Sequence, residues 1–210
     1  VVGSPYSASA HEIGVRSLRH LALDYLLAAQ SASLTEAEQL LESADNLTDR
    51  LAALRWIAQY ANGAQREQTL ANFYDRWKSE SLVVNQWFTV QATRPDISCV
   101  ESVRALLNHD AFDWRNPNKL RALVGAFSAA NPLAFHRADG AGYQLLGDVI
   151  TRIQSSNPQI AARMLAPLTR WRRYAGGQDA MKAELERIAG IDPLPKDVFE
   201  VVNRSLAEPD

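Results

Sequence analysis

Apolar residues recur at helical spacing along almost the whole chain, and no run alternates polar and apolar residues in the period of two that a strand requires. Helix-start and helix-stop residues divide this pattern into short segments. Asn131-Pro132 and Asn157-Pro158 each place a capping asparagine before a proline at the first helical position. The sequence therefore predicts an all-α fold, an irregular α-solenoid curved into an arc or bowl from about a dozen short paired helices.

The first expected helix opens with a capping-box pattern, Ser9 with Glu12, and runs to about Gln30. Its apolar stripe, which we expect neighbouring helices to bury, consists of Ile13, Leu18, Leu21, Tyr25 and Leu26. Asn62-Gly63 is expected to end the third helix. The connections are short, so we expect a single domain over residues 1–210. The other helices are expected at residues 35–43, 46–62, 65–80, 82–91, 97–108, 118–128, 140–156, 158–165, 168–174, 178–188 and 196–206.

The charge balance argues against nucleic acid or a membrane surface as a partner, because 22 basic residues face 24 acidic ones without a basic stripe. No apolar run of about 18 residues is present to span a bilayer. The single cysteine, Cys99, cannot form an internal disulfide, which favours a reducing compartment, the cytoplasm. The first residues, Val1 to Pro5, lack the features of a signal peptide and an initiator methionine, so we expect a chain cut from something longer.

A metal site is not expected from the histidines. A zinc peptidase helix needs His-Glu-x-x-His, because histidines four residues apart share one helical face. His11-Glu12 is followed by Val15 at the required position, and His20 lies nine residues on, on another face. His109 and His136 are far apart in sequence without ligand-spaced partners. Glu12 is therefore interpreted as the capping partner of Ser9.

Other catalytic patterns are missing as well: the sequence has no nucleophile elbow, phosphate loop or dinucleotide fingerprint. Cys99 stands near a helix start, but the following Glu101 would raise rather than lower its thiol pKa, so we expect a buried structural cysteine. We expect the five tryptophans to pack in the core rather than to form a stacking surface for bases or sugars. They are Trp56, Trp77, Trp87, Trp114 and Trp171.

The segment from Asn116 to Tyr143 indicates tightly specified geometry, with two Asn-Pro starts and an Asp-Gly-x-Gly-Tyr turn. Gly125 falls inside an expected helix, where it costs about 1 kcal/mol against alanine, so we expect a close backbone approach there. Arg121 and Arg163 are flanked by apolar helix positions. Such arginines either extend along the surface to solvent or face an enclosed polar space, and the residues alone favour the first.

Many stretches of the chain, in order, resemble the C-terminal helical domain of bacterial aminopeptidase N, of the gluzincin zinc metallopeptidase family. The resemblance covers about Val15 to Leu206, whereas the acidic tail, Glu208 to Asp210, adds nothing. The matching stretches are 44–49, 51–54, 82–84, 87–88, 91–93, 116–118, 125–127, 131–132, 134–136, 139–140, 142–143, 157–159, 162–163, 167–168 and 173–174.

The resemblance implies a superhelical bowl that closes over a catalytic domain and encloses its active-site cavity. It also implies removal of N-terminal residues from peptides, including Ala and basic residues, with the zinc and the acid/base Glu in a preceding domain of the same polypeptide. No catalytic residue, metal ligand or cofactor is then expected in this chain. By position, Arg121, Gln159 and Arg163 are expected to line the cavity on the peptide-leaving side, and His136 and Tyr143 to be structural.

A second class of function stays open: a stand-alone α-solenoid that binds a protein partner without any peptidase. Such a scaffold should present polar outer faces on both terminal helices, whereas a domain taken from a larger enzyme should expose an apolar docking patch.

Overall fold

The computed structural model describes residues 6–207, and within that range all regular structure is helical, which confirms the all-α prediction. By their contacts, residues 1–90 and 91–210 form two compact units, which are described one at a time. A single domain over residues 1–210 and the bowl shape stay predictions. The expectations for Val1 to Pro5 and for the acidic tail fall outside the described range. No helix in that range is long and apolar enough to cross a membrane.

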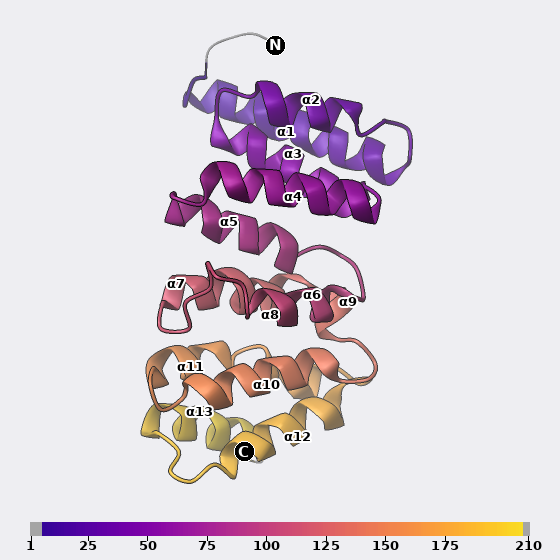
Figure 1. Ribbon diagram of the computed structural model, residues 1–210. Helices are drawn as coiled ribbons and strands as arrows, with labels where there is room; N and C mark the ends of the chain where they lie inside the picture. Colours follow the sequence, from indigo (N-terminus) through magenta and orange to yellow (C-terminus); the bar gives the residue numbers. More distant parts are fainter. Residues whose placement is uncertain (1–5, 208–210) are drawn as a thin grey trace. The chain divides into compact units, whose positions relative to one another are not determined.

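The first unit is organised around its third helix, which contacts the helices before and after it (Figure 1). Trp56 and Ile57 of this helix are fully buried, and Leu27 and Ala37 pack into the same core. The helices are α1 (Ala10–Ala28), α2 (Thr35–Ser43), α3 (Leu47–Tyr60), α4 (Gly63–Trp77) and α5 (Ser81–Ala92).

The apolar stripe expected on α1 is not buried, so that prediction is wrong. Ile13, Leu18, Leu21, Tyr25 and Leu26 are each between 46% and 71% exposed. The helix faces α3 with a mixed side instead. Leu23 and Leu27 pack on the core, Asp24 accepts a hydrogen bond from the indole of Trp56, and His20 and Arg19 contact Asp49 at 2.7 Å. Periodicity identified residues on one face, but it did not identify the face that packs.

Local capping begins most helices of the first unit. Asn46 Oδ1 accepts from the Asp49 backbone N–H at 2.9 Å. Asn62 does not end α3; it caps α4 through the Gln65 N–H at 3.0 Å, which corrects the expected helix end. At α1 only half of the capping box forms, because Ser9 Oγ accepts from the Glu12 N–H while the Ser9 N–H donates to Ser7 Oγ.

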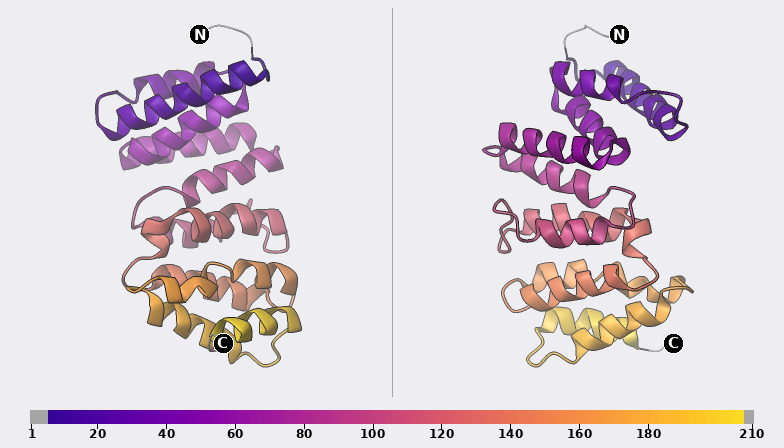
Figure 2. Two further views of the ribbon diagram at one scale, coloured as in Figure 1. Left: turned by 180° about the vertical axis from the view of Figure 1, so that it is seen from behind. Right: turned by 45° about the vertical axis from the view of Figure 1, so that its right-hand side comes forward.

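In the second unit the helices pack not only on their neighbours along the chain but also on the second helix along, as expected for stacked helix pairs. Thus α10 contacts α11 and α12, and α13 contacts α11 and α12 (Figures 1 and 2). The elements are α6 (Cys99–Leu106), α7 (Pro117–Leu120), the π-helical η1 (Arg121–Gly125), α8 (Ala126–Ala130), α9 (Pro132–Phe135), α10 (Ala141–Ile153), α11 (Pro158–Met164), the 3₁₀-helical η2 (Leu168–Arg173), α12 (Gln178–Ala189) and α13 (Lys196–Leu206).

All three Asn-Pro sequences begin helices, with Asn116 capping α7, and the caps expected of Asn131 on α9 and of Asn157 on α11 are confirmed. The tight turn before α10 is confirmed too. Gly140 has a φ of +73°, in the left-handed region that favours glycine. A Cβ on Gly142 would lie 2.3 Å from the Phe135 carbonyl oxygen, so this residue must be glycine for the two backbones to approach.

The close approach expected at Gly125 is absent, so that prediction is wrong. A Cβ there would meet Arg121 Cβ and the Leu120 carbonyl oxygen at 3.8 Å, an ordinary contact distance. Gly125 is the last residue of η1, and the helix simply continues into α8. Backbone crowding therefore does not explain this glycine.

The core assignments are confirmed for most of the residues concerned. Trp56, Trp87 and Trp171 are buried, but Trp77 and Trp114 are half-buried and line recesses instead. Cys99 is fully buried near the Gln91 and Ala92 carbonyl groups, and burial raises the pKa of its thiol to about 11. A thiol of this kind is inert at neutral pH.

Candidate functional site

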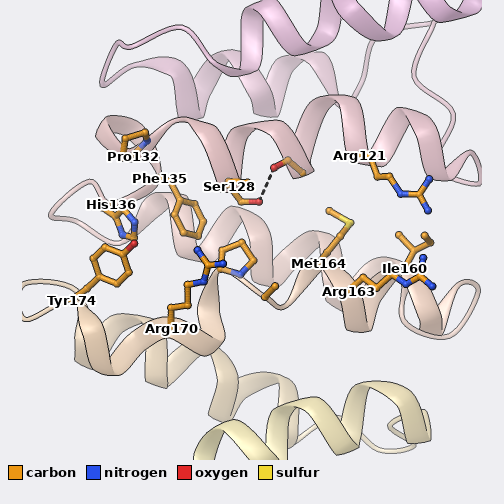
Figure 3. A pocket seen from close by; sticks show the side chains of 14 residues that line it. Arg121, Ser128, Pro132, Phe135, His136, Ile160, Arg163, Met164, Arg170 and Tyr174 are labelled. Atoms are coloured by element: carbon orange, nitrogen blue, oxygen red, sulfur yellow. Dashed lines mark hydrogen bonds between the residues drawn. The ribbon is translucent and has the colours of Figure 1, made fainter.

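A pocket of about 320 Å³ opens in the second unit between the η1–α8–α9 segment and the α11–η2 segment (Figure 3). Its floor is apolar, and three arginines and a histidine–tyrosine pair stand around it. The lining residues are Arg121, Gly125, Ser128, Ala129, Pro132, Phe135, His136, Ile160, Arg163, Met164, Ala166, Pro167, Arg170 and Tyr174.

Arg121 begins the π-helical segment, where the Ala126 backbone N–H donates to the Arg121 carbonyl five residues back. Short π-helical turns inside α-helices occur frequently at functional sites. The extra residue in such a turn changes the direction in which the next side chains point. One guanidinium nitrogen of Arg121 donates to Asn118 Oδ1 at 3.1 Å, which leaves its other donors available.

The sequence predicted three cavity-lining residues, and the structure brings two of them together. Arg121 and Arg163 line the same pocket, and Figure 3 shows their side chains at the same end of it. Gln159 follows the Asn157-Pro158 start of α11, but its side chain is exposed and is not among the lining residues. The role of all three in binding stays a prediction.

The other end of the pocket is formed by His136 and Tyr174, whose rings stack with centroids 4.1 Å apart (Figure 3). His136 Nδ1 lies 2.9 Å from the hydroxyl of Tyr143, which is buried behind it and does not line the pocket. Burial lowers the pKa of His136 and raises the pKa of Tyr143. Both shifts favour the neutral forms, so His136 and Tyr143 are polar but uncharged at neutral pH.

The pocket is built for binding anions or carbonyl groups next to apolar groups. Its lining contains three guanidinium groups and no carboxylate. A guanidinium presents parallel N–H donors that match a carboxylate or a peptide carbonyl. Phe135, Ile160 and Met164 supply the apolar surface between these donors. A short peptide combines these two kinds of group.

Two lining residues escaped the sequence-based prediction, Arg170 and Tyr174. The spacing from Arg163 to Pro167 to Arg170 is i, i+4, i+7, which is the spacing of one helical face. That spacing could have indicated Arg170. However, the break between α11 and η2 concealed it, since a shared face cannot be assumed across a change of helix type.

A metal does not fit the described part of the chain. No group of three or more His, Cys, Asp or Glu side chains converges there. Three of the four histidines are engaged elsewhere: His20 with Asp49, His109 with the Ala111 N–H, and His136 with Tyr143.

Comparison with known proteins agrees with these features. A family model described as a domain of unknown function, DUF3458_C, with ARM repeats matches residues 2–207. The chain is 41% identical to aminopeptidase N of Haemophilus influenzae over 202 residues, and 39% identical to aminopeptidase N of Escherichia coli over 207 residues. These matches cover 96% and 97% of this chain but only 23% and 24% of the two relatives.

A solved structure of Legionella pneumophila aminopeptidase A, in complex with aspartic acid, has 28% sequence identity and a TM-score of 0.87. The match covers 98% of this chain and 25% of that one. This chain thus spans about a quarter of the length of the proteins it matches, and it corresponds to the C-terminal domain of aminopeptidase N. The helical pairs and the match over residues 2–207 together show that the chain belongs to the DUF3458_C family of ARM-repeat domains.

Proposed function

We propose that this chain is the C-terminal domain of a cytoplasmic, zinc-dependent aminopeptidase N of the alanyl type. In this role it caps the catalytic domain of the same polypeptide, encloses the active-site cavity and helps to bind the peptide substrate. The domain binds the part of the peptide that leaves after the N-terminal residue is cut off, and the cleavage itself takes place elsewhere in the enzyme.

The observation that carries this proposal is the placement of Arg121 and Arg163 in one pocket that contains no carboxylate. Two guanidinium groups at one end of an apolar recess can hold a peptide carbonyl or a terminal carboxylate through several N–H donors. Binding of this remote part of the substrate positions the scissile bond, because a correctly held peptide spends more time in a reactive geometry. Gln159, at the exposed start of α11, can add one donor and one acceptor to the peptide backbone.

The exposed face of α1 supports attachment to a larger protein rather than a stand-alone scaffold. Leu18, Leu21 and Tyr25 follow one another at spacings of three and four residues, so they share a face, and all three are more than half exposed. A free-standing solenoid needs a polar outer face on its terminal helices. An apolar stripe at this position is instead typical of a surface that another domain covers.

Zinc and the catalytic acid/base belong, in this proposal, to the catalytic domain. The described residues of this chain offer no cluster that could hold the metal, and we therefore derive no catalytic step through it. The contribution of this domain is limited to binding and orienting the peptide and excluding water from it.

Peptide turnover in the full-length enzyme tests the proposal. Arg121→Ala and Arg163→Ala should each lower kcat/KM for a tetrapeptide by about 10-fold or more, while an alanyl anilide, which lacks a leaving peptide, should be cut at nearly the wild-type rate. Arg173→Ala is the matched control, because Arg173 is exposed on η2 but does not line the pocket. Equal losses on both substrates would contradict the peptide-binding role. Zinc-dependent anilide hydrolysis by residues 1–210 alone would contradict the assignment of catalysis to another domain.

A further inference from the structure

The three arginines of the pocket line one recess without an acidic partner, whereas Arg94, Arg137 and Arg187 of the same unit are paired with carboxylates. Arg94 pairs with Asp96 at 2.9 Å, Arg137 with Glu101 at 2.8 Å, and Arg187 with Glu184 at 2.6 Å. Within residues 6–207, none of the pocket arginines forms an ion pair, and the only hydrogen bond from their guanidinium groups goes to the neutral side chain of Asn118.

The arginines form two separate cationic points. Figure 3 shows Arg121 and Arg163 at one end of the pocket, whereas Arg170 reaches in near Phe135, on the side of His136 and Tyr174. The side chain of Met164 lies between the two points. The two points come from different helices: Arg121 and Arg163 belong to η1 and α11, and Arg170 belongs to η2. The pocket can therefore hold two anionic groups at once, separated by an apolar segment.

Uncompensated like charges around one recess repel one another, and the repulsion is relieved when an anion binds between them. A ligand with a positive charge meets the opposite situation and is rejected. The charge pattern thus selects among peptides, beyond the general peptide binding already proposed.

We propose that Arg170 determines specificity for peptides with an acidic side chain in their leaving portion. It binds the side-chain carboxylate, while Arg121 and Arg163 hold the terminal carboxylate or a backbone carbonyl. The inference rests on the proposed peptide-binding function of the same pocket, and it adds a substrate class, acidic peptides, and a residue that selects them.

Direct binding to the 210-residue chain tests the selection without any catalytic step. The probes are two N-acetylated tripeptides with free C-terminal carboxylates, Ac-Glu-Ala-Ala and Ac-Gln-Ala-Ala, in which two alanines separate the variable side chain from the terminal carboxylate, titrated at low salt and followed by NMR. We expect the Glu peptide to bind roughly 5- to 10-fold more tightly than the Gln peptide, as is typical of one added charge-assisted hydrogen bond. Added salt should reduce this difference.

Three variants distinguish the contribution of Arg170 to peptide binding from that of Arg121 and Arg163. Arg170→Gln should abolish the preference for Glu while the Gln peptide binds as tightly as it does to the wild type. The double variant Arg121→Gln/Arg163→Gln should weaken both peptides by similar factors. Arg173→Gln, on the same 3₁₀ helix but outside the pocket, should change neither.

Any one of three results would overturn the inference. The two peptides could bind equally tightly, or the preference for Glu could survive in Arg170→Gln. The third is that neither peptide binds at 10 mM, a concentration on the order of the weakest affinities that such a pocket supports. The proposed function is judged separately, by turnover of a tetrapeptide against an anilide in the full-length enzyme. If the wild-type chain shows no preference for the Glu peptide while Arg121→Ala and Arg163→Ala still lower tetrapeptide turnover, only the role of Arg170 is refuted.

Discussion

The side-chain amide of Asn131 donates a 2.7 Å hydrogen bond to the backbone carbonyl of Arg94, 37 residues earlier in the chain. It donates a second, at 3.0 Å, to the Ala92 carbonyl, while its Oδ1 accepts from the Ala134 N–H and so caps α9. The residue is only 1% exposed. One asparagine therefore starts a helix and also attaches it to a loop that lies far away in the sequence.

Asn131→Ala should destabilise the protein by about 2–4 kcal/mol, because it removes a helix cap and leaves buried carbonyl groups without their donor. Asn157→Ala is the matched control, since Asn157 also precedes a proline but only caps its own helix, through the Ile160 N–H at 3.4 Å. That substitution should cost about 1 kcal/mol. Urea unfolding measures both values, and equal losses would show that the links to Ala92 and Arg94 contribute nothing.

Two glycine-to-alanine substitutions should have opposite effects. Gly142→Ala places a Cβ 2.3 Å from the Phe135 carbonyl oxygen, and because backbone cannot move aside cheaply we expect a loss of about 2 kcal/mol or more. Gly125→Ala meets only contacts of 3.8 Å inside a helical segment, so it should stabilise the protein by roughly 0.5–1 kcal/mol. Thermal unfolding compares the two variants. A destabilised Gly125→Ala would mean that the π-helical turn itself requires glycine.

The helical fold could be predicted from the sequence because its signals are local. An asparagine that caps a helix and a proline at the next position act within a few residues, so α11 begins at Pro158 as predicted. Asn62 shows the limit of such signals: asparagine–glycine is compatible with a helix end, but the side chain caps the next helix instead. Only the positions of the neighbouring helices decide between the two.

The candidate site could be predicted only in part, for a related reason. Arg121 and Arg163 were singled out through a family resemblance, and their meeting in one pocket depends on how η1 and α11 pack. Arg170 was missed because its helix is of a different type, and Gln159 points to solvent although it is only four residues from Arg163. On α1 the apolar periodicity was read correctly, but periodicity does not say whether another part of the chain covers a face.

Stability should depend on pH through His136, because burial lowers its pKa below the ordinary value of 6.5. The unfolded chain then binds a proton more readily than the folded one as the pH falls below that value. This contribution to stability is therefore present above pH 6.5 and is lost as the pH falls through the lower pKa of the folded state. Urea unfolding at pH 7.5 and at roughly pH 5.5, one unit below the ordinary pKa, should show a smaller decrease for His136→Gln than for the wild type. The same decrease in both proteins would assign the pH dependence to other groups.

The apolar face of α1 should affect association but not folding. Leu18 and Tyr25 are 69% and 71% exposed, so the double variant Leu18→Gln/Tyr25→Gln should keep the unfolding free energy of the 210-residue chain within about 0.5 kcal/mol of the wild type. It should, however, bind the separately produced remainder of the proposed enzyme at least roughly 10-fold more weakly, because large buried side chains dominate such interfaces. Calorimetric titration measures this affinity. Leu82→Gln is the control, since Leu82 is 76% exposed on α5, away from the stripe, and should bind normally. If the double variant binds as tightly as the wild type, another surface of the chain contacts the catalytic domain, and the exposed stripe of α1 has a different partner.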